Sequence, residues 1–534
     1  MRTAGQNFPS YIKYMSETTR QFKSQLPKNA AMAALSFLVY SLSAIWLTPY
    51  LVDHLGEAAY GLVPLAALFT QYVSVITGQL HLSVNRFLTI EIQKPKGNPN
   101  AVFNTAFALY LVLILVQLPL FAWGLVCIDK LFSVPAELRT DALLLLGFSS
   151  ASFLVSLLGA VFGVSTFSRN RLDVLHSLGV VQLIARLVLI VVAFSMFGPK
   201  LRYLGYIDFG LNVIQFFIGL VVWRWLSPEL HISFRHIDWK LLGPIFKMSL
   251  WTLIKQLGAL LYLRTDIWII NRFISPVAAG QYAAILVLVN FIKQIGYRIS
   301  GQAEPTIMAQ FAKGEHEELS KLIVRLVKFT ALLLAIAVGI LCGLTTPLLG
   351  VWLGPNFMEL SSLVWILAAP LFVNIGFCHL YPLQTTCNKV KVPALVTLIL
   401  GVVNVIGSYI LGVQYQYGAV GVAVMTTVVL CANDAVFTPI YNSRYILDIP
   451  AGTLYANVVP SCLVFLLCLA LSMAPLVLGM AIDAWGEILI VSIFAGFAGL
   501  VVSFTLLSRS ERNGLVGYGK EILGRILPKA GISG

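Results

Sequence analysis

Runs of about 20 apolar residues recur along almost the whole chain, which is the length that an α-helix needs to span a hydrocarbon core roughly 30 Å thick. Inside that core every backbone polar group must be paired within the element itself, which favours helices. The composition agrees, since 58% of the residues are hydrophobic, 11% are charged and the mean hydropathy is +0.85. These features predict an all-α, polytopic membrane protein without a large soluble domain.

We expect about fourteen transmembrane helices, at residues 30–51, 60–82, 102–125, 140–163, 174–197, 204–225, 247–271, 279–301, 325–348, 360–383, 393–413, 419–441, 453–475 and 487–507. The expected organisation is an N-terminal cytoplasmic segment (1–29), a six-helix bundle (30–226), a cytoplasmic linker (227–246), a second six-helix bundle (247–445), two additional helices (446–508) and a cytoplasmic tail (509–534). An even number of spans places both termini on one side.

The positive charges predict which side that is. With the N-terminus in the cytoplasm, 27 of the 36 lysines and arginines lie in cytoplasmic segments and five in outer segments. The positive-inside bias therefore predicts a plasma (inner) membrane protein with cytoplasmic termini. The net charge of +13 follows from this topology and from attraction to anionic headgroups, so we expect the lipid bilayer, and no nucleic acid, as partner.

The chain also repeats itself. AAYGL (58–62) and AAGQYAAI (278–285) open the second and eighth expected spans, and the loops STFSRNRLDV (165–174) and QTTCNKVKVP (384–393) occupy matching places. The offsets, 222 residues from Tyr60 to Tyr282 and 218 from Asn170 to Asn388, are nearly constant. Two six-helix bundles of like orientation are expected, with a substrate cavity between them that opens alternately to each side.

Four cations fall well inside the expected spans, away from their ends, where each costs about 2.5 to 3.5 kcal/mol unless it faces water, a partner or a ligand. They are Arg186, Lys255, Arg264 and Lys293. The seven cysteines and seven histidines form no metal-binding spacing, so we predict no metal site and no cofactor.

The segment KQLGALLYLRTDIWII (255–270) holds two of these cations together with Asp266. On one continuous helix, Lys255 and Asp266 would point within about 20° of each other and Arg264 about 180° away. Tyr262 would share the Lys255 side. Counted from the expected outer turn, Lys255 and Lys293 lie at similar depth, so both could meet one anion.

An anionic group such as a phosphate suits these cations, because charge-assisted bonds to it are short and strong. The candidate substrate-binding residues are therefore Arg186, Lys255, Lys293, Arg264 and Tyr262. For Arg264, snorkelling to the interface is the competing interpretation. Asp266 and Asp434 are candidate ion-coupling residues, with a helix-packing role as the alternative for Asp266.

Three segments resemble the multidrug/oligosaccharidyl-lipid/polysaccharide exporter superfamily, and within it the Wzx-type polysaccharide and O-antigen flippases. They are DIWIINRFISPVAAGQY (266–282), TFSRNRLDVLHSLGVVQLIARLVLIV (166–191) and GAVGVAVMTTVV (418–429). The resemblance implies two six-helix bundles that move an undecaprenyl-pyrophosphate-linked oligosaccharide to the outer leaflet by alternating access. It also implies polysaccharide polymerase and chain-length machinery as partners.

Other functions stay open at this point. A cation-coupled multidrug exporter needs buried carboxylates, and residues 30–51 contain none. The four intramembrane cations would also repel an organic cation. The lipid II flippases have fourteen helices, but residues 30–51 lack the arginines typical of their first helix. A membrane glycosyltransferase is disfavoured, because the short loops carry no paired aspartates for a metal, and we predict a protein that is not an enzyme.

Overall fold

The computed structural model describes residues 8–94 and 97–514, which form helices without any strand. Thirteen of these helices are long and apolar enough to cross a membrane, and a shorter apolar helix covers Leu250–Leu263. The prediction of an all-α polytopic protein with about fourteen spans is confirmed. The first long helix starts at Phe8 and so includes most of the segment predicted to precede the first span.

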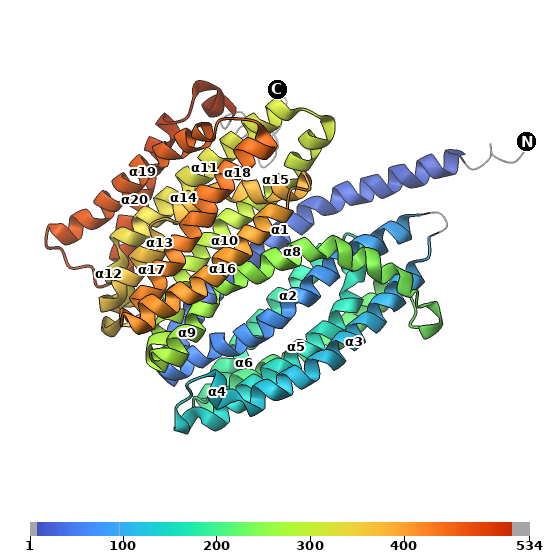
Figure 1. Cartoon of the computed structure of the whole chain (residues 1–534), viewed down its shortest axis with the longest axis horizontal. Coiled ribbons are helices and arrows are strands. Elements are labelled where there is room, and N and C mark those ends of the chain that lie inside the picture. The colour runs from blue at the N-terminus through green and yellow to red at the C-terminus, as the bar shows by residue number, and fades with distance from the viewer. Residues whose placement is uncertain (1–7, 95–96, 515–534) are drawn as a thin grey trace, which may run out of the picture. The chain divides into compact units, whose positions relative to one another are not determined.

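The helices, labelled as in Figure 1, have these bounds: α1 Phe8–Leu55, α2 Glu57–Gln93, α3 Pro99–Val126, α4 Ile128–Leu131, α5 Arg139–Ser168, α6 Leu172–Phe197, α7 Arg202–Leu226, α8 Leu242–Leu263, α9 Thr265–Phe273, α10 Pro276–Lys313, α11 His316–Gly343, α12 Thr345–Leu353, α13 Ser361–Ala368, α14 Leu371–Gly376, α15 Leu380–Thr386, α16 Lys391–Tyr409, α17 Gly418–Leu430, α18 Thr438–Asn442, α19 Ala451–Val477 and α20 Trp485–Thr505. The short π-helical turn η6 (Ile410–Gln414) ends the apolar stretch Lys391–Gln414, and the turns η7 (Cys431–Phe437) and η8 (Ser443–Leu447) lie within the stretch Gly418–Leu447.

Close packing divides the chain into two compact units. Unit 1 comprises Met1–Val287 and Lys391–Val422, and unit 2 comprises Leu288–Val390 and Ala423–Gly534. Unit 1 therefore combines the first six spans with α8, α9, the start of α10 and α16. The predicted boundaries at 226 and 247 follow chain order instead, and they stay a prediction.

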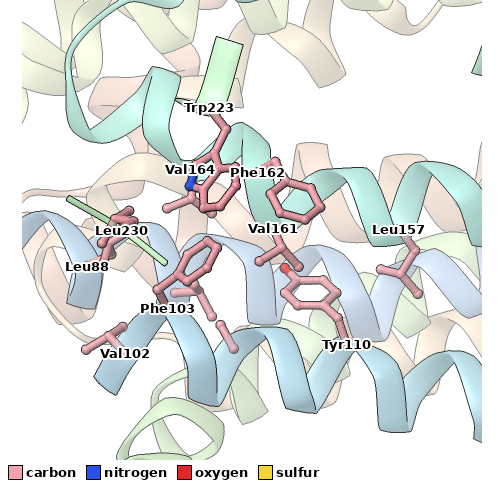
Figure 2. Packing of buried hydrophobic residues seen from close by; sticks show 12 residues of the cluster. Leu88, Val102, Phe103, Tyr110, Leu157, Val161, Phe162, Val164, Trp223 and Leu230 are labelled. Atoms are coloured by element: carbon pink, nitrogen blue, oxygen red, sulfur yellow. The ribbon is translucent and has the colours of Figure 1, made fainter. Parts of the chain in front are cut away.

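The core of unit 1 is aromatic where α3, α5 and α7 meet. Phe103, Phe162 and Trp223 are buried together (Figure 2), and the Phe103 and Trp223 rings stack with centroids 5.5 Å apart. Tyr110 is fully buried in the same cluster. Rings of this size bury large apolar areas, so they hold the three helices at a fixed spacing.

Small residues allow α8 to approach α16 closely, and the two helices lie side by side (Figure 1). A Cβ atom on Gly258 would lie 2.6 Å from the Leu398 backbone nitrogen, and one on Gly401 would lie 2.6 Å from the Gly258 carbonyl oxygen. Glycines of this kind let membrane helices associate through backbone contact. This contact lies three residues after Lys255 along α8.

In unit 2, α11 packs along α19 and α20, the two helices without a repeat mate (Figure 1). A Cβ on Gly339 would lie 2.8 Å from the Cys468 Cβ, and one on Gly343 would lie 2.5 Å from the Ser472 Cβ. Gly499 of α20 approaches the Cys468 sulfur in the same way. Two glycines of α11 thus let α19 approach closely, and Gly499 lets α20 approach α19.

The internal repeat has a local structural counterpart. Asn170 and Asn388 both adopt left-handed backbone conformations, with φ of 54° and 53°. In each turn the following amide donates to a carbonyl five residues back, Arg171 to Thr166 at 2.7 Å and Lys389 to Gln384 at 2.9 Å. Asparagine tolerates this conformation at a helix end better than most residues, so the repeated loops end their helices in the same way.

Candidate functional site

The charged segment is not one helix. α8 ends at Leu263, α9 begins at Thr265, and Arg264 between them has φ −133° and ψ −26°. The predicted helix 247–271 is therefore wrong in its continuity, and the angles assigned to Arg264 and Asp266 relative to Lys255 do not apply. Arg264 is half-buried and lies at the break between α8 and α9, where the regular helical conformation is interrupted.

Asp266 sits on the first turn of α9 and is 2% exposed. Its carboxylate accepts hydrogen bonds from the Tyr282 hydroxyl at 2.9 Å and from the Asn404 amide at 3.1 Å. These partners come from α10 and α16 and are fully buried. The buried hydroxyl of Ser408 lies one turn after Asn404 on α16 and has no hydrogen-bond partner. Asp266 thus joins three helices of unit 1.

Residues on either side of Asp266 extend this cluster. Thr265 and Tyr72 of α2 share a hydrogen bond of 2.5 Å between their hydroxyls, and Tyr262 is 5% exposed at the end of α8. Lys255 is half-buried on α8. Lys255, Tyr262, Arg264 and Asp266 therefore lie within one unit, on the two consecutive helices α8 and α9.

Lys293 lies on the part of α10 that belongs to unit 2 and is 8% exposed. Because Lys255 belongs to unit 1, the predicted meeting of both ammonium groups at one anion stays a prediction. Burial of Lys293 to this degree is unusual for a lysine.

Arg186 of α6 forms an ion pair with Asp208 of α7. The guanidinium Nε lies 2.5 Å from Oδ1, and Nη2 lies 3.1 Å from Oδ2. Two parallel bonds of this kind fix both side chains in one plane. Their side chains remain 26% and 30% exposed, so the pair is half-buried in unit 1.

Two cavities of unit 1 meet at this ion pair. A cavity of about 480 Å³ is lined by residues of α1, α2, α6 and α7, among them Tyr40, Tyr60 and Gln182, and by Val287 of α10. A second cavity of about 270 Å³ lies toward α5. Arg186, Asp208, Asn212 and Val63 line both cavities. The ion pair therefore separates two spaces within the same unit.

Asp434 belongs to unit 2, where it lies on the π-helical turn η7 and is 3% exposed. Its carboxylate accepts hydrogen bonds from the hydroxyl of Tyr381 and, at 2.6 Å, from the Asn433 amide. Turns of π-helix frequently occur at functional sites. Asp266 and Asp434 are thus two separate buried carboxylates.

The sequence did not single out Asp208 and Asn212, the residues that lie beside Arg186 in the structure. Asn212 donates from its amide to the Ser152 hydroxyl and to the Asp208 carbonyl, both at 2.8 Å. The available signal was that Asp208 is the one carboxylate on the span that follows Arg186. Within the residues that the structure describes, no group of three or more histidines, cysteines, aspartates or glutamates could hold a metal ion.

Comparison with known proteins identifies the family. Residues 26–308, more than half of the chain, match the family described as "Polysaccharide biosynthesis protein". The chain belongs to that family. A curated relative, the uncharacterized membrane protein EpsK of Bacillus subtilis (strain 168), is 29% identical over 486 residues, which is 90% of this chain and 95% of EpsK.

Solved structures with the same fold include two transporters. The lipid II flippase MurJ, in an inward closed conformation, has a TM-score of 0.68 at 13% identity and covers 89% of this chain and 97% of its own. An inward-facing MATE family multidrug transporter of the MOP superfamily has a TM-score of 0.59 at 16% identity, covering 79% and 96%. This member of the polysaccharide biosynthesis family is therefore a multi-pass membrane protein with the MOP transporter fold, as the sequence resemblance predicted.

Proposed function

We propose that the protein is a flippase for a lipid-linked oligosaccharide, carried as an undecaprenyl-pyrophosphate conjugate from the inner to the outer leaflet of the plasma membrane by alternating access. The observation that carries the proposal is the match of more than half of the chain to a polysaccharide biosynthesis family in a protein with a transporter fold. Both termini would lie in the cytoplasm, and polymerase and chain-length machinery would receive the translocated unit.

The intramembrane cations support an anionic headgroup as cargo. Lys293 is buried on α10, and Lys255 and Arg264 lie half-buried on and after α8. Cations at membrane depth are costly and are retained where they serve a substrate or ion pathway. A pyrophosphate offers each of them charge-assisted hydrogen bonds, which are stronger than bonds between neutral groups. Lys255 and Lys293 are each proposed as a residue that binds the pyrophosphate, and the isoprenoid tail would remain in lipid.

The proposal assigns ion coupling to Asp266, with Asp434 as the alternative. Asp266 holds α9 to α10 and α16 through Tyr282 and Asn404, so a change of its charge alters the contacts of three helices. A buried carboxylate that gains a proton or a cation changes its preferred partners. Asp434 has a similar degree of burial but bonds to its own neighbour Asn433 and to Tyr381.

Reconstitution in liposomes tests the proposed function. Translocation of a fluorescent undecaprenyl-pyrophosphate oligosaccharide is measured for wild type, Lys255→Gln and Lys293→Gln, with Lys321→Gln as the control, because Lys321 is exposed on α11. Loss of one charge-assisted bond, about 1.5 to 3 kcal/mol, lowers the rate about tenfold or more in the first two variants. The control keeps the wild-type rate.

Each alternative function has its own signature in the same liposomes. Wild-type translocation of lipid II with equal efficiency would favour a lipid II flippase, and efflux of organic cations without lipid translocation would favour a multidrug exporter. Wild-type rates in both Lys255→Gln and Lys293→Gln would remove these lysines from the substrate site.

A further inference from the structure

The larger cavity of unit 1, between α1, α2, α6 and α7, has a chemistry that differs from that of an anion site. We propose that this Arg186 cavity, defined by its lining residues Tyr40, Tyr60, Gln182, Arg186, Asp208 and Asn212, binds a neutral sugar ring of the carried oligosaccharide. The proposal rests on the proposed function and adds to it a separate site for the glycan, apart from the lysines that hold the pyrophosphate.

Charge is the first argument. Among the residues that the structure describes, Arg186 and Asp208 are the only charged ones that line either cavity, and they neutralise each other through two parallel hydrogen bonds. An anion that approached the guanidinium would meet the carboxylate beside it, and an organic cation would meet the guanidinium beside the carboxylate. The pair therefore favours a ligand without net charge.

Hydrogen-bonding capacity is the second argument. The guanidinium has five N–H donors and uses Nε and Nη2 toward Asp208, so donors remain for a ligand. Each carboxylate oxygen keeps acceptor capacity beyond its one bond to Arg186. Neighbouring hydroxyls of a sugar both donate and accept, so one hydroxyl can bond to the carboxylate while the next accepts from the guanidinium.

The two carboxamides add to this pattern. Asn212 uses its amide hydrogens on Ser152 and on the Asp208 carbonyl, which fixes the group and leaves its Oδ1 as an acceptor. Gln182 is half-buried on α6, one turn before Arg186. Planar polar groups at fixed positions provide orientation and specificity in small-molecule sites.

Size and apolar surface complete the fit. The cavity holds about 480 Å³, within the roughly 300 to 1,000 Å³ that is typical of small-molecule sites. Two tyrosines line it: Tyr60 is 7% exposed and shares a 3.4 Å contact between its hydroxyl and that of Thr48, whereas Tyr40 is half-exposed. Their rings offer apolar faces for the C–H surface of a pyranose, and their hydroxyls offer further polar contacts.

The test measures lipid binding to the full chain in nanodiscs by fluorescence quenching. The probes are undecaprenyl pyrophosphate without sugar and the same lipid bearing one glucose, galactose, N-acetylglucosamine or N-acetylgalactosamine. The variants are Asp208→Asn, Gln182→Ala and Lys255→Gln. Gln215→Ala is the matched control, because Gln215 is a half-buried glutamine on α7 that lines neither cavity.

Wild type should bind at least one glycosylated lipid more tightly than the sugar-free lipid. Asp208→Asn and Gln182→Ala should lower that affinity about tenfold, as expected for lost hydrogen bonds, while affinity for the sugar-free lipid changes less than about twofold. Lys255→Gln should lower both affinities, and Gln215→Ala neither. Gln182 takes no part in the ion pair, so its variant reports on the cavity even if Asp208→Asn fails to fold.

Three results would overturn the inference. If the cavity variants lose equal affinity for the sugar-free and the glycosylated lipid, the ion pair either binds the pyrophosphate or only stabilises the fold. Equal wild-type affinity for sugar-free and all glycosylated lipids would remove the sugar site while leaving the proposed function intact. Wild type that binds neither kind of lipid would contradict the proposed function and the sugar site together.

Discussion

Each unit contains a carboxylate paired with a basic side chain, and the two ion pairs differ in how far the surrounding side chains bury them. Arg186 and Asp208 in unit 1 border two cavities, with side chains 26% and 30% exposed. Lys328 of α11 and Glu511, which follows α20 in unit 2, lie 2.9 Å apart with side chains only 10% and 9% exposed. The first pair, called the open pair below, borders empty space, whereas the second, the closed pair, is surrounded by packed side chains.

The closed pair has a clear structural task. Glu511 also accepts from the Ser508 backbone amide at 2.7 Å, and its own amide donates to the Ser508 hydroxyl at 3.3 Å. Glu511 therefore caps the helical turn that follows α20 and ties it to α11 through Lys328. The comparison suggests that surroundings, and not the pairing itself, separate a binding group from a structural one.

The largest expected effect is on the closed pair. Lys328→Met leaves the Glu511 carboxylate buried without its cation, which costs about 3 kcal/mol of unfolding free energy. Unfolding in detergent, followed by tryptophan fluorescence, measures the change. The control is Lys321→Met, since Lys321 pairs with Glu317 and Glu318 at the surface, where such pairs contribute about 1 kcal/mol or less. Similar losses in both variants would contradict the assigned burial.

Exchanging the charges within each pair separates binding from structure. The double variant Arg186→Asp with Asp208→Arg keeps a pair and costs about 1 kcal/mol or less in stability. It displaces donors and acceptors from their places in the cavity, so translocation of the glycosylated lipid falls about tenfold. The matched exchange, Lys328→Glu with Glu511→Lys, should leave the translocation rate unchanged. If the variant with Arg186 and Asp208 exchanged transports the lipid at the wild-type rate, this pair has only a structural role.

The smallest expected effect is the loss of stability at low pH through protonation of Glu511. Burial raises the pKa of Glu511, but the hydrogen bonds from Lys328 and from Ser508 outweigh it and hold that pKa below its usual value. A carboxyl with a depressed pKa in the folded state stabilises the fold above its unfolded pKa, and this contribution is lost as the pH falls through the folded value.

Lowering the pH from 6 to 4 should therefore remove about 1 kcal/mol or less from unit 2, or about 2 °C in the thermal midpoint. Glu511→Gln should be less sensitive to pH over this range than wild type. A variant that keeps the full acid sensitivity of wild type would show that other carboxylates cause it.

Much of the fold could be predicted, because its strongest determinant is local. Spans such as Arg202–Leu226 can be recognised in the sequence as apolar runs that are long enough to cross a membrane. The repeated loops at Asn170 and Asn388 likewise carry their turn geometry in a few residues. The break at Arg264 could not be predicted in this way, because residues 247–271 read as one apolar run.

The site was predictable only in its residue types. An intramembrane charge is conspicuous in any hydropathy pattern, so Arg186, Lys255, Lys293 and Asp266 could be selected. Their partners could not, because partners depend on how neighbouring helices are rotated and how deep each residue lies. Asp208 lies on the span that follows Arg186, yet its bond to Arg186 depends on the packing of α6 on α7.

The sequence by itself determined that this chain is a helical membrane protein of repeated design with charges at membrane depth, because bilayer thickness and the cost of burying charge act on each segment separately. Tertiary structure decided that Arg186 is neutralised by Asp208 beside two cavities, that Asp266 joins α9, α10 and α16, and that Lys328 is closed off by Glu511. Those outcomes depend on distances of a few ångströms between segments that are far apart in the chain, and local sequence patterns carry no such distances.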